Sequence, residues 1–520
     1  MGKYFIVFIL VFSSLYSQIP NRRVVAEWEP ALGTMIRWPL GIPSDLVAEL
    51  AEDDILYVLV ENMNQLNSAR NSFISWNIDM SNVDFVFTDT YSHWTRDHGP
   101  QFLIGENHWE VVNQEFDGYP VESGCQEVNN LNGQDEGRPL DDEGRGWEED
   151  DDTNIDFANH LNWDILDIPV YWTGGNFMTD GYGMGFSTEL MVNENNMNEN
   201  EFKNIIEEYL SIDSYHILDN PNVESIQHID CMAKLVDSET IIIKQVSELS
   251  PEYECIEEFA DYFYDLNTFY GRPFEIHRIY CPEIDAPWWE VNSVAAYTNS
   301  LILNSKVLVP QYGISADVQA LEIYEQAMPG YEVIGFNEST SSPWYGEDAL
   351  HCRVMGIFDP NMIHISHKSI RDEDIISNGQ IYIEAEVVDY ANQGIDLIML
   401  HWKYSAEDGP FSQIELEFSS DNIYSATFPI LNSSSLIEYY IVATNSEGGM
   451  ALHPNAGWHT FNTLEFMVGD INEDTFINIQ DIVLMINLVL MQNYNGAADL
   501  NFDGIIDVLD IVQLVNIVLS

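Results

Sequence analysis

The stretch Ile55-Leu56-Tyr57-Val58-Leu59-Val60 decides the fold class, because six consecutive apolar residues rich in β-branched side chains predict a buried strand. The run from Ser300 to Leu303 has the same character, and helical stretches such as Glu201 to Leu210 lie between runs of this kind. Short strands and helices mixed from Arg23 to about Lys368 predict an α/β body of the size of a catalytic domain. We assign residues 18–370 to this body.

After the body, the pattern changes to short alternating runs separated by Gly, Asn and Ser. The clearest runs are Ile381 to Val387, Leu397 to Tyr404 and Glu438 to Ala443. Strands of this length at this spacing predict an immunoglobulin-like β-sandwich over residues 371–466. It carries no obvious chemistry, so a role as a spacer or stabilising module is favoured over a ligand-binding one.

The last segment contains an internal repeat in which oxygen-bearing side chains recur at positions 1, 3, 5, 9 and 12 of a loop. Each loop precedes a helix rich in Ile, Val and Leu, and this ligand spacing is typical of Ca²⁺ loops. The predicted metal ligands are Asp470, Asn472, Asp474, Asn478 and Asp481 in the first copy and Asp499, Asn501, Asp503, Asp507 and Asp510 in the second.

The tail, residues 467–520, resembles type I dockerin domains, which are small α-helical calcium-binding modules. The resemblance implies Ca²⁺ as a bound ion and a cohesin-type protein as a partner. The second copy has Gly504 at the sharp-turn position, whereas the first has Thr475 there. We therefore expect the first copy to bind calcium less tightly.

The N-terminus has the layout of a secretory signal, with Lys3, the apolar run Tyr4 to Phe12 and small residues before Gln18. Residues 1–17 are accordingly predicted to be a signal peptide and the protein to be secreted or associated with the cell surface. Later stretches fall short of the roughly 20 apolar residues that span a bilayer, so no membrane span is predicted.

The net charge excludes some classes of partner. Lys and Arg number 18 against 86 Asp and Glu, which gives a formal charge of −68. Such a chain repels nucleic acid and anionic membranes, so nucleic-acid binding is excluded. Solubility in a salty extracellular medium is the simplest interpretation, and a cationic substrate is compatible with it. The segment Gln134 to Asp152 alone holds ten acidic residues and is predicted to be an exposed loop rather than a metal-binding insertion.

The cysteines set limits on disulfide pairing. The chain has an odd number of cysteines, so at least one cysteine stays free or pairs between chains. One free thiol is a candidate nucleophile, although a secreted cysteine is more often a disulfide partner and a metal site would use the same residue types. The five positions are Cys125, Cys231, Cys255, Cys281 and Cys352.

His228-Ile229-Asp230 is a candidate catalytic pair. On an extended segment both side chains would point to one face, because the strand period is two residues. The same geometry would place Cys231 on the opposite face. A zinc-ligand pair and an ordinary hydrogen-bonded polar pair remain open on these residues alone.

Several compact segments occur in order along the body and together resemble the Porphyromonas-type peptidylarginine deiminases, relatives of the agmatine deiminases. The segments run from Ala26-Glu27-Trp28-Glu29-Pro30 through Trp94 to Pro100, Gly174 to Gly181, His228 to Cys231 and Ala296 to Asn304 to Leu350-His351-Cys352-Arg353. The resemblance implies a five-bladed pseudo-symmetric α/β propeller of the pentein type with a central active site, followed here by the sandwich and the tail. It also implies hydrolysis of peptidyl-arginine to peptidyl-citrulline and ammonia, with no cofactor for catalysis.

The resemblance also implies residue roles. Cys352 matches the nucleophile, which would form a thiouronium intermediate with the guanidinium carbon, and His228 matches the general acid and base. Asp97 and Asp230 match the carboxylates that bind the guanidinium, Asn299 a catalytic asparagine that orders the site, and Trp94 an aromatic that packs on the substrate stem. Gly174, Gly175 and Asn176 are expected to shape the pocket wall or to form a structural turn. We expect Cys352 to be a free thiol.

One departure from the family concerns the substrate. The secreted peptide-modifying relative has two closely spaced arginines that hold a peptide C-terminal carboxylate, and the stretch Gln114 to Val121 has none. Arg138 or Arg145 could replace them. We therefore expect internal arginine in a basic peptide, or a small decarboxylated guanidine such as agmatine, to be a better substrate than C-terminal arginine. The rival hypotheses are an agmatine deiminase-like enzyme and an inactive propeller that acts as a dockerin-tethered binding module.

Overall fold

The computed structural model places most of the chain, apart from its N-terminus and several loops. It describes residues 22–106, 108–116, 118–119, 125, 147–221, 226–285, 293–346, 348–371, 381–428, 435–463, 469–472, 476–491, 495–501 and 505–519. The predicted signal peptide, residues 1–17, lies outside the described residues. Among the described residues, no helix combines the length and apolar character needed to cross a bilayer.

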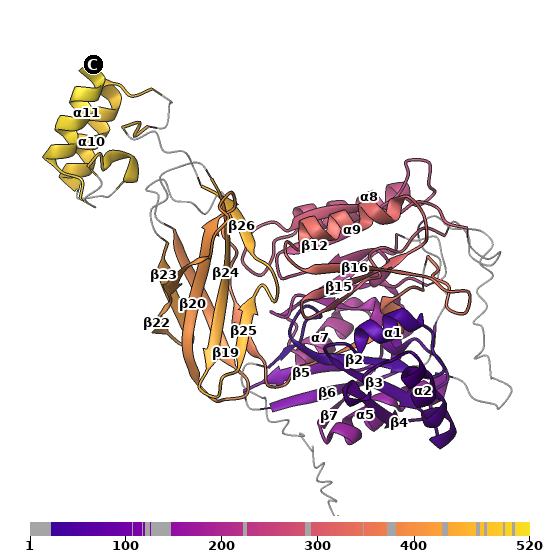
Figure 1. The fold of residues 1–520 in the computed structure, drawn as a ribbon. Coiled ribbons are helices and arrows are strands. Elements are labelled where there is room, and N and C mark those ends of the chain that lie inside the picture. The colour runs from indigo at the N-terminus through magenta and orange to yellow at the C-terminus, as the bar shows by residue number, and fades with distance from the viewer. Residues whose placement is uncertain are drawn as a thin grey trace, which may run out of the picture.

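The body is built from five small sheets of three or four strands each (Figure 1). In sheet order the strands are β1 (Arg23–Val24), β5 (Gln101–Gly105), β6 (His108–Glu115) and β7 (Asp164–Tyr171); β8 (Met178–Thr179), β9 (Met184–Thr188) and β10 (Ser214–Leu218); β11 (Ala233–Leu235), β12 (Thr240–Gln245) and β13 (Glu275–Tyr280); β14 (Leu301–Leu303), β15 (Lys306–Gln311) and β16 (Glu332–Asn337); and β17 (Met355–Phe358), β2 (Ala31–Arg37), β3 (Ile55–Val60) and β4 (Val83–Phe87).

All five sheets follow one pairing pattern. A leading strand (β5, β8, β11, β14 or β17) pairs antiparallel with a second strand, which pairs parallel with a third. Parallel neighbours need a crossover connection, and helices supply it in each sheet. These helices are α1 (Ser44–Leu50), α4 (Trp147–Asp151), α5 (Thr153–Leu161), α6 (Leu190–Glu194), α7 (Glu199–Leu210), α8 (Tyr253–Asp265) and α9 (Ala316–Ala327), and α2 (Met63–Ser75) and the short turn η1 (Met80–Asn82) lie between β3 and β4.

The fifth sheet joins the two ends of the body. Its leading strand β17 comes last in the chain, whereas its second strand β2 comes near the start, with Met355 opposite Met35. The predicted α/β class is thus confirmed. Five sheets also match the number of blades expected, but no sheet among the described residues closes on itself, so the propeller arrangement stays a prediction.

The strand and helix that decided the class are both present. Residues Leu56 to Val60 of β3 are buried, because β3 lies between the parallel strands β2 and β4. Helix α7 begins with a capping box between Asn198 and Glu201 and buries Phe202, Ile206 and Leu210, which share one face at helical spacing.

The predicted β-sandwich is present as two antiparallel sheets beside the body (Figure 1). Residues alternate between buried and exposed along β19, as expected for a strand with one face in a core. The first sheet begins with β18, which lies before residue 371 but pairs with β19, so the sheet includes a strand from the segment assigned to the body. The strands are β18 (Ile363–Ser366), β19 (Tyr382–Asp389), β23 (Ile423–Thr427) and β22 (Glu417–Ser420), and β21 (Ser412–Glu415), β20 (Ile395–Tyr404), β24 (Leu436–Asn445), β25 (Met450–His453) and β26 (His459–Asn462).

The sandwich packs directly on the body. The side-chain amide of Asn455 donates to the carbonyl oxygen of Trp28, and Arg272 Nη2 donates to the carbonyl oxygen of Ser369 at 2.6 Å. Gly457 has φ +66°, and a Cβ there would lie 1.8 Å from the carbonyl oxygen of Pro329. Only glycine permits this approach. These contacts support a stabilising module rather than a loose spacer.

One disulfide is present among the described residues. Cys125 and Cys255 are bonded, with their Cα atoms 6.0 Å apart, while Cys231, Cys281 and Cys352 are free and buried. The expectation that Cys352 is a free thiol is met. Two further thiols are free as well, and one of them matters for the site described next.

Candidate active site

Five short turns carry the predicted catalytic residues, and each comes directly before the leading strand of one sheet. Four of them are helical turns, and the fifth is the turn around Asn299 that precedes β14. The repeat of the fold therefore brings segments from all five sheets to one place, with α3 packed against η2 and η4 and η2 packed against η3. The helical turns are α3 (Thr95–His98), η2 (Gly174–Asn176), η3 (Ile229–Cys231) and η4 (His351–Arg353).

Asp97, His228 and Asp230 converge above Gly175. A Cβ on Gly175 would lie 2.6 Å from Asp97 Oδ1, 3.0 Å from His228 Nδ1 and 3.1 Å from Asp230 Oδ2. The backbone N–H of Gly175 donates to Asp97 Oδ1 at 3.1 Å, and the hydroxyl of Tyr119 donates to Asp97 Oδ2 at 2.7 Å. Glycine at this position lets two carboxylates and an imidazole approach the backbone without a Cβ between them.

The nucleophile candidate Cys352 is held by Asn299. The amide Nδ2 of Asn299 donates to Cys352 Sγ at 3.2 Å, and its Oδ1 accepts from the backbone N–H groups of His351 at 2.9 Å and Cys352 at 3.3 Å. On its other side, Cys352 Sγ lies 3.8 Å from Asp230 Oδ2. One amide side chain therefore fixes both the turn that carries the thiol and the sulfur itself.

The position predicted for Cys231 is wrong. His228 to Cys231 do not form a strand but a 3₁₀ turn, η3, whose cap is His228. Successive side chains in such a turn are rotated by about 120° rather than 180°, so Cys231 does not point away from the site. Its sulfur lies 3.5 Å from Asp230 Oδ1 and 3.8 Å from Asn299 Nδ2, which places a second thiol beside Cys352.

In this structure the pKa values of Asp97, Cys352 and His228 favour the uncharged forms of these groups. Burial raises the pKa of Asp97 well above its usual value, and Asp230 adds to the effect. The hydrogen bond with Cys231 lowers the pKa of the Cys352 thiol, but burial and the charges of Asp230 and Asp97 outweigh it and raise this pKa to about 11. Burial lowers the pKa of His228 to about 4, although Asp230 opposes it. A cation bound between the carboxylates would reverse the shifts of Asp97 and Cys352.

Asp230 keeps its charge through a histidine without a predicted role. His351 Nδ1 lies 2.7 Å from Asp230 Oδ2, and His351 Nε2 lies 2.5 Å from Glu27 Oε2. Burial raises the pKa of Asp230, but the hydrogen bond and charge of His351 outweigh it and lower this pKa overall. His351 thus fixes the orientation of one clamp carboxylate.

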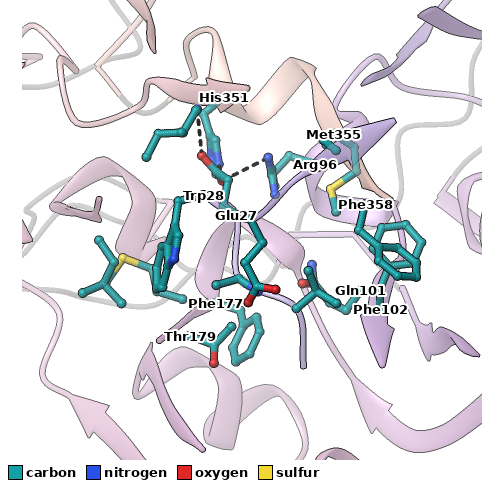
Figure 2. A pocket seen from close by; sticks show the side chains of 18 of the residues that line it. Glu27, Trp28, Arg96, Gln101, Phe102, Phe177, Thr179, His351, Met355 and Phe358 are labelled. Carbon is teal, nitrogen blue, oxygen red and sulfur yellow. Dashed lines mark hydrogen bonds and ion pairs between the residues drawn. The ribbon is translucent and has the colours of Figure 1, made fainter. Parts of the chain in front are cut away.

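Glu27 in turn joins two buried cations to this network. Lys234 Nζ lies 3.0 Å and Arg96 Nη2 3.2 Å from Glu27. Burial raises the pKa of Glu27, but the charges of His351, Lys234 and Arg96 hold it well below its usual value. These side chains, together with Asp230, line a cavity of about 70 Å³, and Figure 2 shows Glu27, Arg96 and His351 of this lining. A space of this size accommodates water beside the buried charges.

The predicted substrate aromatic Trp94 belongs to a cluster. Its ring centroid lies 5.5 Å from that of Tyr119 and 5.8 Å from that of Trp147, and Tyr119 lies 5.9 Å from the ring of His228. Trp147 and Asp150 fall in the segment predicted to be an exposed loop, yet both are buried in or beside α4. Gln134 to Gly146, including Arg138 and Arg145, lies outside the described residues.

Asn176, predicted to line the pocket, makes hydrogen bonds through its side-chain oxygen. Its Oδ1 accepts from the N–H of Thr188 at 3.0 Å and from the N–H of Ile229 at 3.2 Å. Its side-chain oxygen therefore holds the turn η3, as the structural-turn alternative expects, and a contact of Asn176 with substrate stays a prediction. Sequence reasoning also gave no role to Glu27, Tyr119, Lys234 or His351. Glu27, Lys234 and His351 lie in or near the motifs quoted above. A charged residue in an apolar segment does not show, from the sequence, which distant residue it contacts.

The tail contains helices α10 (Ile479–Met491) and α11 (Val508–Leu519), with the short turn η6 (Gly496–Ala498) between them. In the first loop Asp481 accepts from the N–H groups of Ile471, Asn472 and Asn478, and in the second Asp510 accepts from those of Leu500, Asn501 and Asp507. Both carboxylates are fully buried. Residues 467–520 contain no Lys, Arg or His, so no side chain of the tail can balance these charges. A bound cation fits this arrangement; the predicted ligands Asp474 and Asp503 lie outside the described residues.

Comparisons with known proteins agree with this site. The chain is 28% identical over 202 residues to a protein of Lactococcus lactis named agmatine deiminase, covering 34% of this chain and 55% of that protein. It is 27% identical over 290 residues to one of Enterococcus faecalis with the same name, covering 50% and 73%. A Porphyromonas gingivalis crystal structure described as an arginine deiminase shares the fold, with a TM-score of 0.53, 17% identity and coverage of 65% of this chain and 98% of that one.

Two family profiles match the chain. The one described as dockerin type I domain matches residues 468–519, which confirms the assignment of the tail. The other, described as Porphyromonas-type peptidyl-arginine deiminase, matches residues 23–357 and so covers more than half of the chain and every turn of the site. The chain belongs to the Porphyromonas-type peptidyl-arginine deiminase family.

Proposed function

We propose that the protein is a guanidine deiminase that hydrolyses one C–N bond of an arginine-type guanidinium. The observation that carries the proposal is the placement of the Cys352 thiol beside Asp230, which faces Asp97 across the space above Gly175. Two carboxylates match the two N–H edges of a planar guanidinium through paired, charge-assisted hydrogen bonds. The charged Asp230 attracts a cation to this space, and a bound cation would favour the charged forms of Asp97 and Cys352.

The chemistry follows from the same groups. A bound guanidinium lowers the pKa of Cys352, its thiol proton passes to His228, and the thiolate attacks the guanidinium carbon. His228 protonates the leaving nitrogen, ammonia departs, and a cationic thiouronium remains on the sulfur. His228 then takes a proton from water, the hydroxide adds to the same carbon, and the C–S bond breaks to give a urea and the free thiolate. The balance is guanidinium plus water to urea plus ammonium.

Peptidyl-arginine is the proposed substrate, which would yield peptidyl-citrulline. Its aliphatic stem would pass the cluster of Trp94 and Tyr119, where aromatic faces can pack on methylene groups. A small guanidine is the second candidate, because the two relatives compared above are named agmatine deiminases. Its product would be a carbamoylated amine on the route to putrescine.

The finer architecture is also a proposal. We infer that the five sheets with one pairing pattern stand around a central axis as a five-bladed pentein-type α/β propeller. The proposed divisions are a signal peptide at 1–17, the deiminase at 18–370, with β18 as its border strand, the sandwich at 371–466 and the tail at 467–520. Export would place the enzyme outside the cell or on its surface.

For the tail we propose calcium binding by the ten loop residues named above and docking to a cohesin-type partner. The buried, unbalanced Asp481 and Asp510 support a cation in each loop. Calcium prefers oxygen ligands in this spacing. The catalytic groups are a thiol, an imidazole, an amide and two carboxylates, so the proposed reaction assigns calcium to the tail alone.

The test is formation of ureido products from the purified full chain. Matched peptides with internal arginine, C-terminal arginine and amidated C-terminal arginine are compared with agmatine by kcat/KM. Cys352→Ala should abolish turnover, and Cys281→Ala, which removes another buried free thiol, should preserve it. Turnover that survives Cys352→Ala would refute the mechanism. Absence of turnover on every guanidine would favour an inactive propeller used as a tethered binding module.

A further inference from the structure

A group of potential metal ligands includes the nucleophile and its neighbours. The proposed reaction does not use these side chains to bind a metal. Within the described residues, one set of three His, Cys, Asp or Glu side chains brings its donor atoms within 4.8 Å of one another, namely Asp230, Cys231 and Cys352. All three are buried. They come from two turns that are distant in sequence, so their meeting is a product of the tertiary fold.

We propose that these three side chains form a binding site for a soft divalent metal ion of the Zn²⁺ class, and that the bound ion blocks deimination. Two thiolates and one carboxylate are a ligand set that favours zinc over calcium or magnesium. The ion would occupy the cationic position of the site and engage Cys352, so metal and guanidinium would exclude each other. The blocking effect rests on the proposed function; the binding does not.

The distances suit a tetrahedral ion. With Zn–S near 2.3 Å and Zn–O near 2.1 Å, ligand atoms of one site stand about 3.6 to 3.8 Å apart. Asp230 Oδ1 lies 3.5 Å from Cys231 Sγ, and Asp230 Oδ2 lies 3.8 Å from Cys352 Sγ. Small rotations of these side chains would bring one carboxylate oxygen and both sulfurs to a common centre. Water can complete the fourth position.

The surroundings already support metal ligands. His351 Nδ1 holds Asp230 at 2.7 Å, and Glu27 holds the far nitrogen of His351, an arrangement that orients a ligating carboxylate. Asn299 Nδ2 lies 3.2 Å from one sulfur and 3.8 Å from the other, so that it can donate to both thiolates. Binding would release the two thiol protons, and the two thiolates and the Asp230 carboxylate would coordinate the ion.

The decisive variant is Cys231→Ala, because Cys231 is the one of the three side chains that the proposed reaction uses neither as nucleophile nor as clamp. The full chain is assayed in excess Ca²⁺, which saturates the tail, and in a non-thiol reductant. Zn²⁺ should inhibit the wild type in competition with the guanidine, and a chelator should restore activity. Relative to its own zinc-free rate, Cys231→Ala should need at least about tenfold more Zn²⁺ for half inhibition, since one thiolate ligand is lost. Cys281→Ala should behave as wild type. Equal zinc sensitivity in Cys231→Ala would overturn the proposal.

A direct measurement does not depend on turnover. Co²⁺ added to the wild type should give a thiolate-to-metal charge-transfer absorption, which should weaken by about half in Cys231→Ala and stay unchanged in Cys281→Ala. This band would remain if the protein proved not to be a deiminase. A wild type without the band would overturn the proposal. A different result would also overturn it: activity that is lost only with oxidants and is restored by a reductant but not by a chelator. That result would show that Cys231 and Cys352 form a disulfide.

Discussion

Asn299 holds Cys352 by two routes: its amide nitrogen donates to the sulfur at 3.2 Å, and its amide oxygen accepts the backbone N–H of the same residue at 3.3 Å. Asn299→Ala removes both and should lower kcat on the order of 10²-fold, because a positioned donor to a developing thiolate is lost. Asn299→Asp keeps an accepting oxygen but adds a negative charge beside the thiol. It should lower kcat further, as measured by steady-state kinetics with circular dichroism as a folding control. An Asn299→Ala enzyme with wild-type kcat would contradict this role.

Gly175→Ala should remove activity without unfolding the body. The added Cβ would fill the space between Asp97, His228 and Asp230. Displacing reacting groups by about 1 Å can cost about 10²-fold in rate, so kcat/KM should fall at least that much. Gly356→Ala is the matched control, since no atom lies within 4 Å of a Cβ there. A fully active Gly175→Ala enzyme would mean that the substrate binds elsewhere.

Alkylation should report the charge state of Cys352. Because its pKa is raised to about 11 and only the thiolate reacts, labelling by neutral iodoacetamide should be slow at pH 7 and rise toward pH 11. A cationic chloroacetamidine should label faster at pH 7, since its charge stabilises the thiolate. The labelled cysteine is identified by mass mapping in a Cys281→Ala background. This variant removes the Cys281 thiol, whose pKa is also raised to about 11. A labelling plateau near pH 7 in the ligand-free protein would contradict the prediction.

Acid should weaken the contact between sandwich and body. Burial and the neighbouring His367 lower the pKa of His453 to about 3, so the folded state binds its proton less tightly than the unfolded state does. Stability should therefore fall as pH drops below about 6.5, by about 2 kcal/mol at pH 5 for this group. Thermal unfolding of His453→Asn should show a smaller decrease from pH 7 to 5 than the wild type. His160→Asn, at an exposed histidine, should not differ from the wild type.

Calcium should organise the tail and leave catalysis unaffected. Chelation should unfold α10 and α11 first, because Asp481 and Asp510 then remain buried without a balancing charge. Deimination should persist. In calorimetric titrations Asp481→Ala should abolish the weaker site and Asp510→Ala the tighter one, given Thr475 and Gly504 at the turn positions. Loss of deimination on chelation would point to a metal near the acidic segment instead.

The local elements could be predicted because their patterns are self-contained. The apolar run of β3 and the amphipathic face of α7 need no knowledge of distant residues. The place of β18 in the sandwich could not be predicted, because this strand joins the sheet only by its pairing with β19. The common pairing pattern of the five sheets also depends on which strands become neighbours in the fold.

The site shows the same limit. Family motifs identified Asp97, Asp230 and Cys352, but the assumption of a strand placed Cys231 on the wrong side. The role of Glu27 depends on partners far along the chain, since it meets His351, Lys234 and Arg96 only in the folded state. Burial of Trp147 within an acidic segment has the same origin, because its aromatic partners Trp94 and Tyr119 come from other segments.

Because β17 pairs with β2, the proposed activity requires that both ends of the body have been synthesised. Turn η4, which carries Cys352, leads directly into β17, and among the described residues β17 pairs with one strand, β2, from the other end of the body. A nascent or truncated chain that lacks either strand has no anchored thiol, whatever else has folded. A circular permutant offers the converse case. If β17 and β2 are joined covalently and the new chain ends lie between two other sheets, the proposed reaction should be retained.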